Sequence, residues 1–561
     1  MVAKLKQLGS WLDRNLLVVL TSALIVLIPA LPKLPLADLI EGYIVRLRAE
    51  DILVGFTALV WLVQLVRKKV TIPKNIVTYF ILAYLIIGAA SSLSAVFVTK
   101  TVPLQWQHLA KLSLHYVRRL EYMSLFFITY SSIRSKKELK LFLKLMLTTI
   151  VLVAAYGFGQ KYLYWPAFST MNREFSKGMR LYLTPESRVM STFAGHYDYA
   201  AYLMMALVAL ITAIWVVKSW KTKLSLFLLT LAAYWSLILT ASRTSFLGYL
   251  FGVTIAAVLA RGILPLWKRL LNWLVVVSLS LTVMLTLGDL SERFFQVLQT
   301  PDILIHEITQ KTPLQRDSLE KFSASIEGKL VEFQASLTTL KENLYKPFKK
   351  KPPKNAISTD DVSKVAVRSD TPPTPVKPEL PPDVTPEEDL FRKEQEASLS
   401  GSTKISETSG YSPNALKYGL SVAIRLDALW PRAIAGFRKN PLLGSGYSTL
   451  VKEELNEFTQ AESTDNDFLR MLGETGILGT VTFLGAIFSL CYLAFRILKD
   501  SSDVFAKAFA IGLVGIVGAL LVNAVYIDVF ESSKVIYTFW MLAAILVYLY
   551  ENRRSLKLSA K

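Results

Sequence analysis

The stretch STDNDFLRMLGETGILG, residues 463–479, decides how this chain is organised. It joins a polar cluster, DND at residues 465–467, to an apolar segment that begins near Gly476 and is long enough to cross a membrane. It also closes the longest segment without membrane character, about residues 291–466. Polar groups at the junction between a loop and a bilayer are costly to bury without partners, so we expect them to have a function.

The composition is typical of a polytopic helical membrane protein. Hydrophobic residues make up 52% of the 561 residues, well above the share in a soluble domain. Apolar runs of about 16–25 residues recur along the chain, and a helix of that length spans a bilayer. The alternating pattern of an outer-membrane barrel is missing. The single cysteine, Cys491, excludes an intrachain disulfide and a cysteine-based metal site.

We predict an all-α polytopic membrane protein with about twelve transmembrane helices. Lysine and arginine gather in every second short loop, which predicts that both termini are cytoplasmic. The net charge of +20 follows this pattern, and no basic stripe with exposed aromatic residues indicates nucleic-acid binding. The predicted spans are residues 16–31, 52–66, 76–98, 114–130, 141–158, 199–217, 224–240, 244–259, 270–287, 476–498, 504–525 and 535–550.

The spans divide the chain into three regions. Residues 1–290 are predicted to form a transmembrane bundle, and residues 467–561 contribute the last spans. Residues 291–466 form a large external loop between the ninth and tenth spans. Within it, residues 346–412 are dense in proline and charge, which predicts a disordered linker. Residues 413–466 regain an ordered pattern and are expected to belong to the functional site.

Charged residues are predicted to gather at the external ends of the spans. Arg188 and His196 lead into the sixth span, and Arg243 lies in the short ASRTS turn between the seventh and eighth. Arg425 and Asp465 belong to the end of the long loop. Transporters more often carry such groups at the membrane midplane. Because arginine binds phosphate bidentately, the clustering indicates a site for a lipid head group with an anionic part.

Several of these charges also have a purely structural interpretation. Arg118 and Glu121 have the i,i+3 spacing of an ion pair within one helix, so Arg118 is either half of such a pair or a binding residue. Arg470 lies in a similar series and is predicted to belong to a surface ion ladder. Arg243 has the alternative of a snorkelling anchor. We favour binding, since a short turn would hold it rigidly where a phosphate lies.

Four stretches together carry a family likeness. The combination of SRT in a turn, PLLGSGY, and DN-x-x-L followed by ETGILG resembles the O-antigen ligase / O-antigen polymerase superfamily of bacterial glycan transferases. The likeness covers most of the chain except residues 346–412 and the helical segment before them. In the family's order, the stretches are RVMSTFAGHYDYAAYL from Arg188, LTASRTSFLG from Leu239, SVAIRLDALWPRAIAGFRKNPLLGSGY from Ser421 and TDNDFLRMLGETGILG from Thr464.

The resemblance implies a GT-C-like enzyme at the outer face of the bacterial cytoplasmic membrane. It would transfer a glycan, with inversion, from an undecaprenyl diphosphate carrier to a hydroxyl acceptor on a glycan, lipid or protein. Neither a cofactor nor a metal is implied. Arg243 and Arg188 would hold the diphosphate, Arg425 would belong to the loop that closes over it, and Arg118 is a further candidate. The remaining partners would be membrane lipids, and no nucleic acid is expected.

The sequence departs from the family at the expected base. Family ligases carry a histidine before the asparagine of an HN motif, and this chain has Asp465 before Asn466. A free aspartate has a pKa of about 4, against about 6.5 for histidine, so it is the weaker base. Glycosidases nevertheless use carboxylates at oxocarbenium-like centres. We predict Asp465 as the base, Asn466 as its positioning partner, and His196 as the reserve base. The spacing of Asp465 and Asp467 also fits a divalent metal site.

Two other classes of function stay open. A transporter or flippase for an envelope glycan or a small anion would also be polytopic and charged. A non-catalytic envelope-assembly protein would use the arginines as anchors and the proline-rich linker to recruit partners. Ligases and polymerases perform the same bond exchange on different acceptors, so the sequence predicts both equally.

Overall fold

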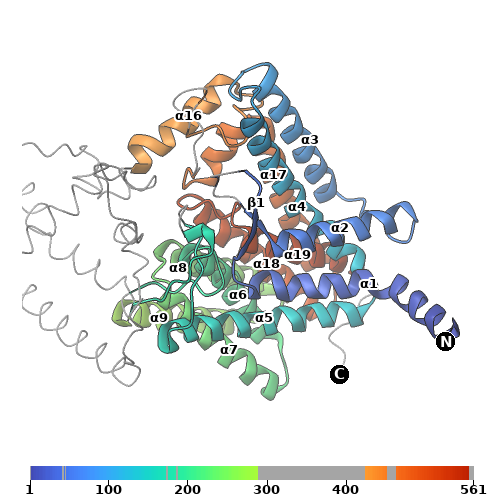
Figure 1. Ribbon diagram of the computed structural model, residues 1–561. Coiled ribbons are helices and arrows are strands. Elements are labelled where there is room, and N and C mark those ends of the chain that lie inside the picture. The colour runs from blue at the N-terminus through green and yellow to red at the C-terminus, as the bar shows by residue number, and fades with distance from the viewer. Residues whose placement is uncertain are drawn as a thin grey trace, which may run out of the picture.

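The protein is a bundle of long helices with one small antiparallel sheet, formed by β1 (Pro35–Asp38) and β2 (Arg46–Arg48) (Figure 1). The sequence did not predict these two short strands. The predicted linker at residues 346–412, and most of the predicted external loop, lie outside the described residues. The computed structural model describes residues 2–40, 43, 46–171, 175–184, 187–287, 424–451, 456 and 463–554.

Each predicted span falls on one helix. Ten of the described helices are long and apolar enough to cross a membrane, which establishes a polytopic membrane protein. α1 has a shorter apolar part, and α4 is less apolar because it carries Arg118, Arg119 and Glu121. The total of about twelve spans therefore stays a prediction. The helices are α1 (Val2–Ala30), α2 (Ala49–Val66), α3 (Ile76–Phe97), α4 (Trp106–Ser132), α5 (Lys136–Leu163), α6 (His196–Val216), α7 (Trp220–Leu239), α8 (Arg243–Leu259), α9 (Leu266–Leu287), α16 (Trp430–Lys439), α17 (Asp467–Asp500), α18 (Val504–Ala524) and α19 (Ser533–Glu551).

Side-chain contacts bring the beginning of α1 and the end of α19 to the same end of the bundle. Asp13 in α1 forms an ion pair with Arg67, directly after α2, at 2.6 Å. Trp61 in α2 donates a hydrogen bond to Ser131 in α4 at 3.0 Å. Tyr130 in α4 donates a hydrogen bond to Glu551, the last residue of α19. These contacts agree with the predicted alternation of the spans, and the side of the membrane on which this end lies stays a prediction.

Glycines let α8 and α18 approach each other closely. A Cβ atom added at Gly252 would lie 2.7 Å from the carbonyl oxygen of Gly515, and one added at Gly515 would lie 2.7 Å from that of Gly252. Small residues serve the same purpose in many pairs of membrane helices. Because α8 and α18 run antiparallel, this contact holds the beginning of α8 beside the end of α18.

Gly252→Ala is expected to destabilise the protein by about 1–3 kcal/mol, because the added methyl group overfills a packed contact. Gly55→Ala in α2 is the matched control, since no atom lies within 4 Å of a Cβ added there. The measurement is thermal unfolding of both purified variants in one detergent. The interpretation is wrong if the two variants unfold at the same temperature.

α17 is broken at Gly476, whose φ of 66° and ψ of −166° lie outside the helical region. Such a break frees backbone groups that need other partners. The loop after α16 supplies them: Ser445 donates its N–H to the Gly473 carbonyl at 2.8 Å, and Ile477 donates to the Pro441 carbonyl at 2.9 Å. The PLLGSGY loop therefore forms backbone hydrogen bonds with the ETGILG segment at the break in α17.

Candidate functional site

The loop that precedes α17 is held in place by one carboxylate. Asp528, in the turn between α18 and α19, accepts hydrogen bonds from the N–H groups of Thr464 and Asn466, at 3.1 and 2.9 Å. It also accepts one from the Thr464 hydroxyl at 3.1 Å and forms an ion pair with Arg470 at 3.0 Å. Both neighbours of Asp465 in the sequence are thus anchored to the same group.

Asp465 itself has a sparsely populated backbone conformation. Its φ is 49°, in the left-handed region, and such local strain is concentrated at functional sites. Its Oδ2 lies 2.8 Å from Nη2 of Arg425, and its Oδ1 accepts a hydrogen bond from the Ser463 hydroxyl at 2.7 Å. The side chain is 33% exposed, so it is accessible from outside the fold.

The surroundings of Asp465 make it a better base than a free aspartate. Burial raises the pKa of Asp465, the guanidinium of Arg425 opposes this rise, and the carboxylate of Asp528 adds to it. The net shift is upward, which brings the carboxylate closer to the basicity of an imidazole. The weakness of aspartate as a base, which the sequence suggested, is therefore partly compensated by the fold.

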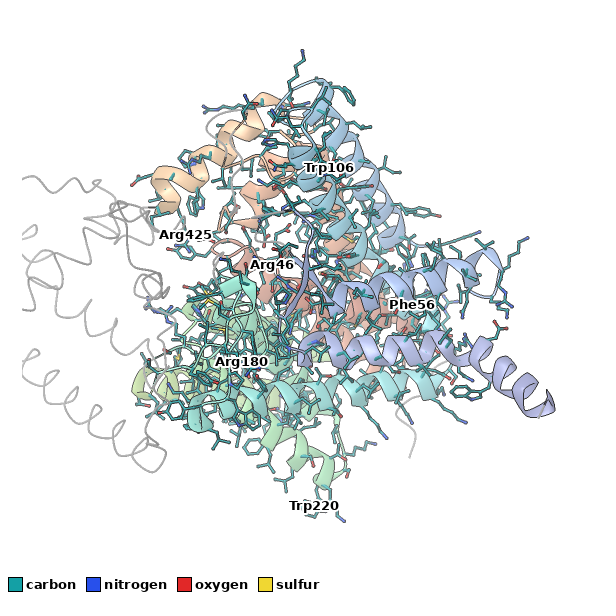
Figure 2. The ribbon with its side chains drawn as sticks, viewed as in Figure 1. Arg46, Phe56, Trp106, Arg180, Trp220 and Arg425 are labelled. Atoms are coloured by element: carbon teal, nitrogen blue, oxygen red, sulfur yellow. The ribbon has the colours of Figure 1, made fainter. Side chains whose placement is uncertain are left out.

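Arg425 begins a π-helix, η6 (Arg425–Leu429), that continues into α16. Figure 2 shows its side chain where this segment begins. π-helical turns are rare in proteins, and those that occur are often found at functional sites. The guanidinium also lies over the ring of Tyr526, 4.1 Å from the centroid, just after α18. Arg425 thus connects the beginning of the η6–α16 segment with Asp465 and with Tyr526, at the end of α18.

Arg188 and His196 lie in direct contact. Nη1 of Arg188 is 3.3 Å from Nε2 of His196. A guanidinium only donates hydrogen bonds, so Nε2 is the acceptor, and the imidazole is neutral with its proton on Nδ1. Because the nitrogen that would take a proton is occupied, His196 is a weaker candidate base than Asp465. Val189 donates its N–H to the Leu239 carbonyl at 3.0 Å, which attaches this segment to the end of α7, close to Arg243.

The sequence suggested that Arg243 lies in the turn between the seventh and eighth spans. In the structure it is the first residue of α8. This position puts its charge beside a helix N-terminus, which itself favours anions. Two residues later, the Ser245 hydroxyl accepts a hydrogen bond from the amide of Asn523 at 3.0 Å. Asn523 is three positions before Tyr526, so the end of α18 connects the Arg243 region with the Arg425–Asp465 pair.

The other predicted arginine, Arg118, is occupied by two carboxylates. It lies 2.5 Å from Asp51 and 3.1 Å from Glu121, and Glu121 also accepts a hydrogen bond from Tyr537 at 3.2 Å. The i,i+3 ion pair that the sequence suggested as an alternative is therefore confirmed. We leave Arg118 out of the proposed diphosphate site, because its charge is already compensated inside the fold.

The prediction of a surface ion ladder for Arg470 is wrong. Arg470 is 6% exposed and lies 3.0 Å from Asp528, 3.5 Å from Glu474 and 3.9 Å from Glu531. Arg119 is 3.6 Å from Glu474 and also pairs with Glu531. These five groups form a buried network that joins α4, α17 and the α18–α19 turn. Helical spacing alone could not distinguish a buried network from a surface one.

Two residues of the DND cluster have structural partners. Asn466 caps α17 by accepting the Leu469 N–H on its Oδ1 at 3.0 Å, so its predicted catalytic role stays a prediction. Asp467 accepts the Phe530 N–H on its Oδ2 at 3.0 Å, whereas Asp465 binds Arg425. The two carboxylates have different partners, and the described residues contain no group of three or more potential metal ligands.

Sequence reasoning missed a buried lysine at the beginning of α19. Lys534 donates hydrogen bonds to the carbonyls of Pro29 at 3.2 Å and Thr192 at 2.7 Å, and it is 1% exposed. It therefore attaches the segment that carries Arg188 to α1 and α19. The sequence feature that could have identified Lys534 is its position at the edge of an apolar span, on the side of the membrane where the charge pattern predicts few lysines.

No protein-family model matches the chain, and no curated protein is significantly similar to it.

Proposed function

We propose that the protein is a membrane glycosyltransferase that moves a glycan from a polyprenyl diphosphate carrier to a hydroxyl acceptor. The observation that supports this most is the Arg425–Asp465 pair, with 2.8 Å between Nη2 and Oδ2, on a strained loop. Arg188 and Arg243 belong to the same end of the bundle. A carboxylate base combined with arginines for a leaving diphosphate is what such a transfer requires.

In the proposed reaction, the acceptor hydroxyl attacks the anomeric carbon on the face opposite the diphosphate, so the configuration inverts. Asp465 takes the hydroxyl proton as the new glycosidic bond forms. The bond between the anomeric carbon and the diphosphate oxygen breaks, and Arg243 and Arg188 stabilise the charge on the leaving group. A carboxylate has about four lone-pair positions, so Asp465 retains capacity for the acceptor beside Arg425 and Ser463.

We assign the site to the outer face of a bacterial cytoplasmic membrane, with both termini in the cytoplasm. The support for this is the distribution of lysine and arginine among the short loops. The partners would be a lipid-linked glycan donor and a glycan, lipid or protein acceptor. The same bond exchange gives a polymerase when the acceptor is another lipid-linked glycan, and a ligase when it is a different molecule.

Arg243→Ala is expected to lower glycan transfer by about 10²–10³-fold, because one donor for the developing diphosphate charge is removed. The measurement is a gel profile of surface glycans from cells with the intact gene, a deletion, Arg243→Ala or Arg261→Ala. Arg261 is the matched control, since it is exposed just beyond the opposite end of α8.

The gel profile of surface glycans also distinguishes a polymerase from a ligase. Single repeat units on the acceptor without a long ladder would identify a polymerase. Polymer that stays on the lipid carrier would identify a ligase. An unchanged profile for Arg243→Ala, at a normal protein level, would contradict the proposal and favour a transport or assembly role.

A further inference from the structure

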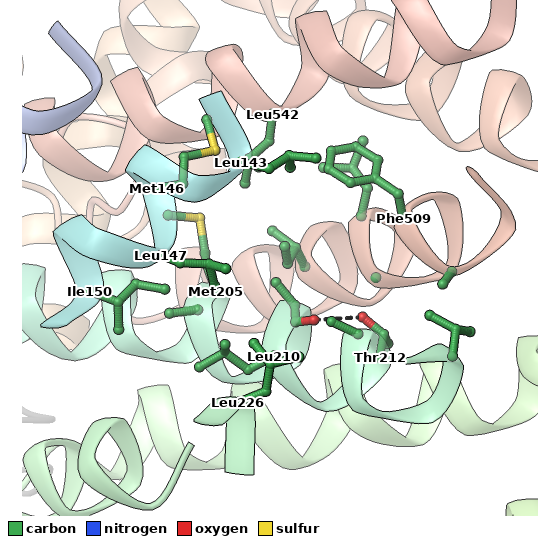
Figure 3. Close-up of a pocket in the computed structure, with 18 of the residues that line it drawn as sticks. Leu143, Met146, Leu147, Ile150, Met205, Leu210, Thr212, Leu226, Phe509 and Leu542 are labelled. Carbon is green, nitrogen blue, oxygen red and sulfur yellow. Dashed lines mark hydrogen bonds between the residues drawn. The ribbon is translucent and has the colours of Figure 1, made fainter. Parts of the chain in front are cut away.

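A cavity of about 270 Å³ lies between α5, α6, α7, α18 and α19, and Figure 3 shows the side chains around it. Its wall consists almost entirely of aliphatic and aromatic side chains, among them Met146, Met205 and Phe509. The hydroxyl of Thr212 on this wall donates to the Val208 carbonyl of its own helix at 3.0 Å. A cavity with such a wall has an affinity for hydrocarbon and little for water.

Most of the cavity lies in the half of the bundle away from the candidate functional site. Along α6 its wall runs from Tyr202, six residues after His196, to Val217 just after the helix. At about 1.5 Å per residue, the wall begins roughly 9 Å and ends roughly 30 Å from His196 along the helix axis. Phe505 near the beginning of α18 lines the cavity, and Asn523 of the functional site is near the end of α18. The cavity is therefore a separate feature.

Lysines lie near the cavity, on the helices that form it or directly after them. Each of the five is adjacent in sequence to a residue of the cavity wall, and long lysine side chains reach the head-group region from such positions. One acidic residue, Asp503, lies within two positions of the wall, and it is buried and caps α18 through the Ala506 N–H at 3.0 Å. The rim is therefore positively charged. The lysines are Lys144, Lys218, Lys221, Lys223 and Lys507.

We propose that this cavity binds a hydrocarbon chain of an anionic phospholipid from the membrane leaflet at the lysine-rich end of the bundle. The chain would fill the apolar space, whose lining atoms otherwise lack partners. The lysines would contact the phosphate, as basic residues do at anionic membrane surfaces. The lipid would hold α5, α6 and α18 together, and this proposal is independent of glycan transfer.

The test is native mass spectrometry of the full-length protein in detergent, with added phosphatidylglycerol or phosphatidylcholine of equal chain length. We expect one phosphatidylglycerol molecule to be retained in preference to phosphatidylcholine, and the unfolding temperature to rise with phosphatidylglycerol. Ala213→Phe fills the cavity and is expected to abolish retention of this molecule. Ala209→Leu is a milder filling variant, should the first one not fold.

Lysine variants test the charged part of the proposal. Lys221→Gln combined with Lys223→Gln is expected to weaken phosphatidylglycerol binding by roughly 10–30-fold without changing phosphatidylcholine binding, because each lysine attracts the anionic head group. Lys68→Gln with Lys268→Gln removes two exposed lysines that do not flank the cavity and is the matched control. Ala58→Phe is the control for filling, because Ala58 is a partly buried alanine away from the cavity.

Two results would overturn the proposal. Equal loss of lipid in Ala213→Phe and Ala58→Phe would show that the cavity is not where the chain binds. Equal retention of phosphatidylglycerol and phosphatidylcholine by the intact protein would show that the lysine rim does not select an anionic head group. Neither result bears on the Arg425–Asp465 site, because no glycan is transferred in the experiment.

Discussion

Replacing Asp465 with alanine is expected to lower glycan transfer by about 10²–10⁴-fold, the usual contribution of a positioned general base. The fold should survive, since the Asp465 side chain is 33% exposed and the loop is anchored through Asp528. The measurement is the rate of transfer in membranes that contain equal amounts of each variant. Asp38→Ala, at an exposed carboxylate on β1, is the control and should retain full activity.

The pH dependence of transfer gives a sharper test of the same assignment. Protonated Asp465 cannot accept the hydroxyl proton, so the rate falls as the pH decreases through its pKa. Because burial raises the pKa of Asp465, this fall is expected at a higher pH than the value of about 4 for a free aspartate. Arg425→Gln removes the guanidinium that lowers this pKa, so the fall should move to a still higher pH.

A histidine at this position offers a complementary variant. Asp465→His introduces the residue that family ligases carry, and its free pKa is about 6.5. Activity should be restored in part relative to Asp465→Ala, with the fall in rate displaced to higher pH than in the intact protein. If the profiles of the intact protein, Arg425→Gln and Asp465→His coincide, Asp465 is not the base.

Replacing Asp528 with alanine is expected to have the largest effect on stability. The change leaves the N–H groups of Thr464 and Asn466 without their acceptor, and it removes the nearest of the three carboxylates around the buried charge of Arg470. Removing one partner of a buried ion pair costs about 3–5 kcal/mol. Thermal unfolding should show this loss, whereas Asp13→Ala, which breaks an exposed pair with Arg67, should have little effect on stability.

Asp528→Asn separates a positioning role from a purely structural one. The amide retains one acceptor oxygen and removes the negative charge that raises the pKa of Asp465. Residual transfer should therefore fall off at a lower pH than in the intact protein, opposite to Arg425→Gln. A variant that is merely less stable would lose activity at every pH alike, and that result would contradict coupling between Asp528 and Asp465.

The positions of the helices could be predicted from the sequence because the length of an apolar run is a local property. The prediction of a span at residues 76–98 agrees with α3, Ile76–Phe97, and the one at 504–525 agrees with α18, Val504–Ala524. The predicted span at residues 476–498 begins at Gly476, where α17 is broken. The polar turns from Asp467 to the break belong to the same element, and they are buried against the ion-pair network.

The sequence also indicated which residue types gather at one end of the bundle, but only the tertiary structure decided the partner of each charge. Arg425 and Arg470 have the same side chain, yet Arg425 pairs with Asp465 on an accessible loop and Arg470 is buried among carboxylates. Asp528, a partner of Arg470, is 58 positions away from it in the sequence. Periodicity reports only neighbours within one helix. Charge compensation depends on groups that come together when the helices pack, and the fold alone determines which they are.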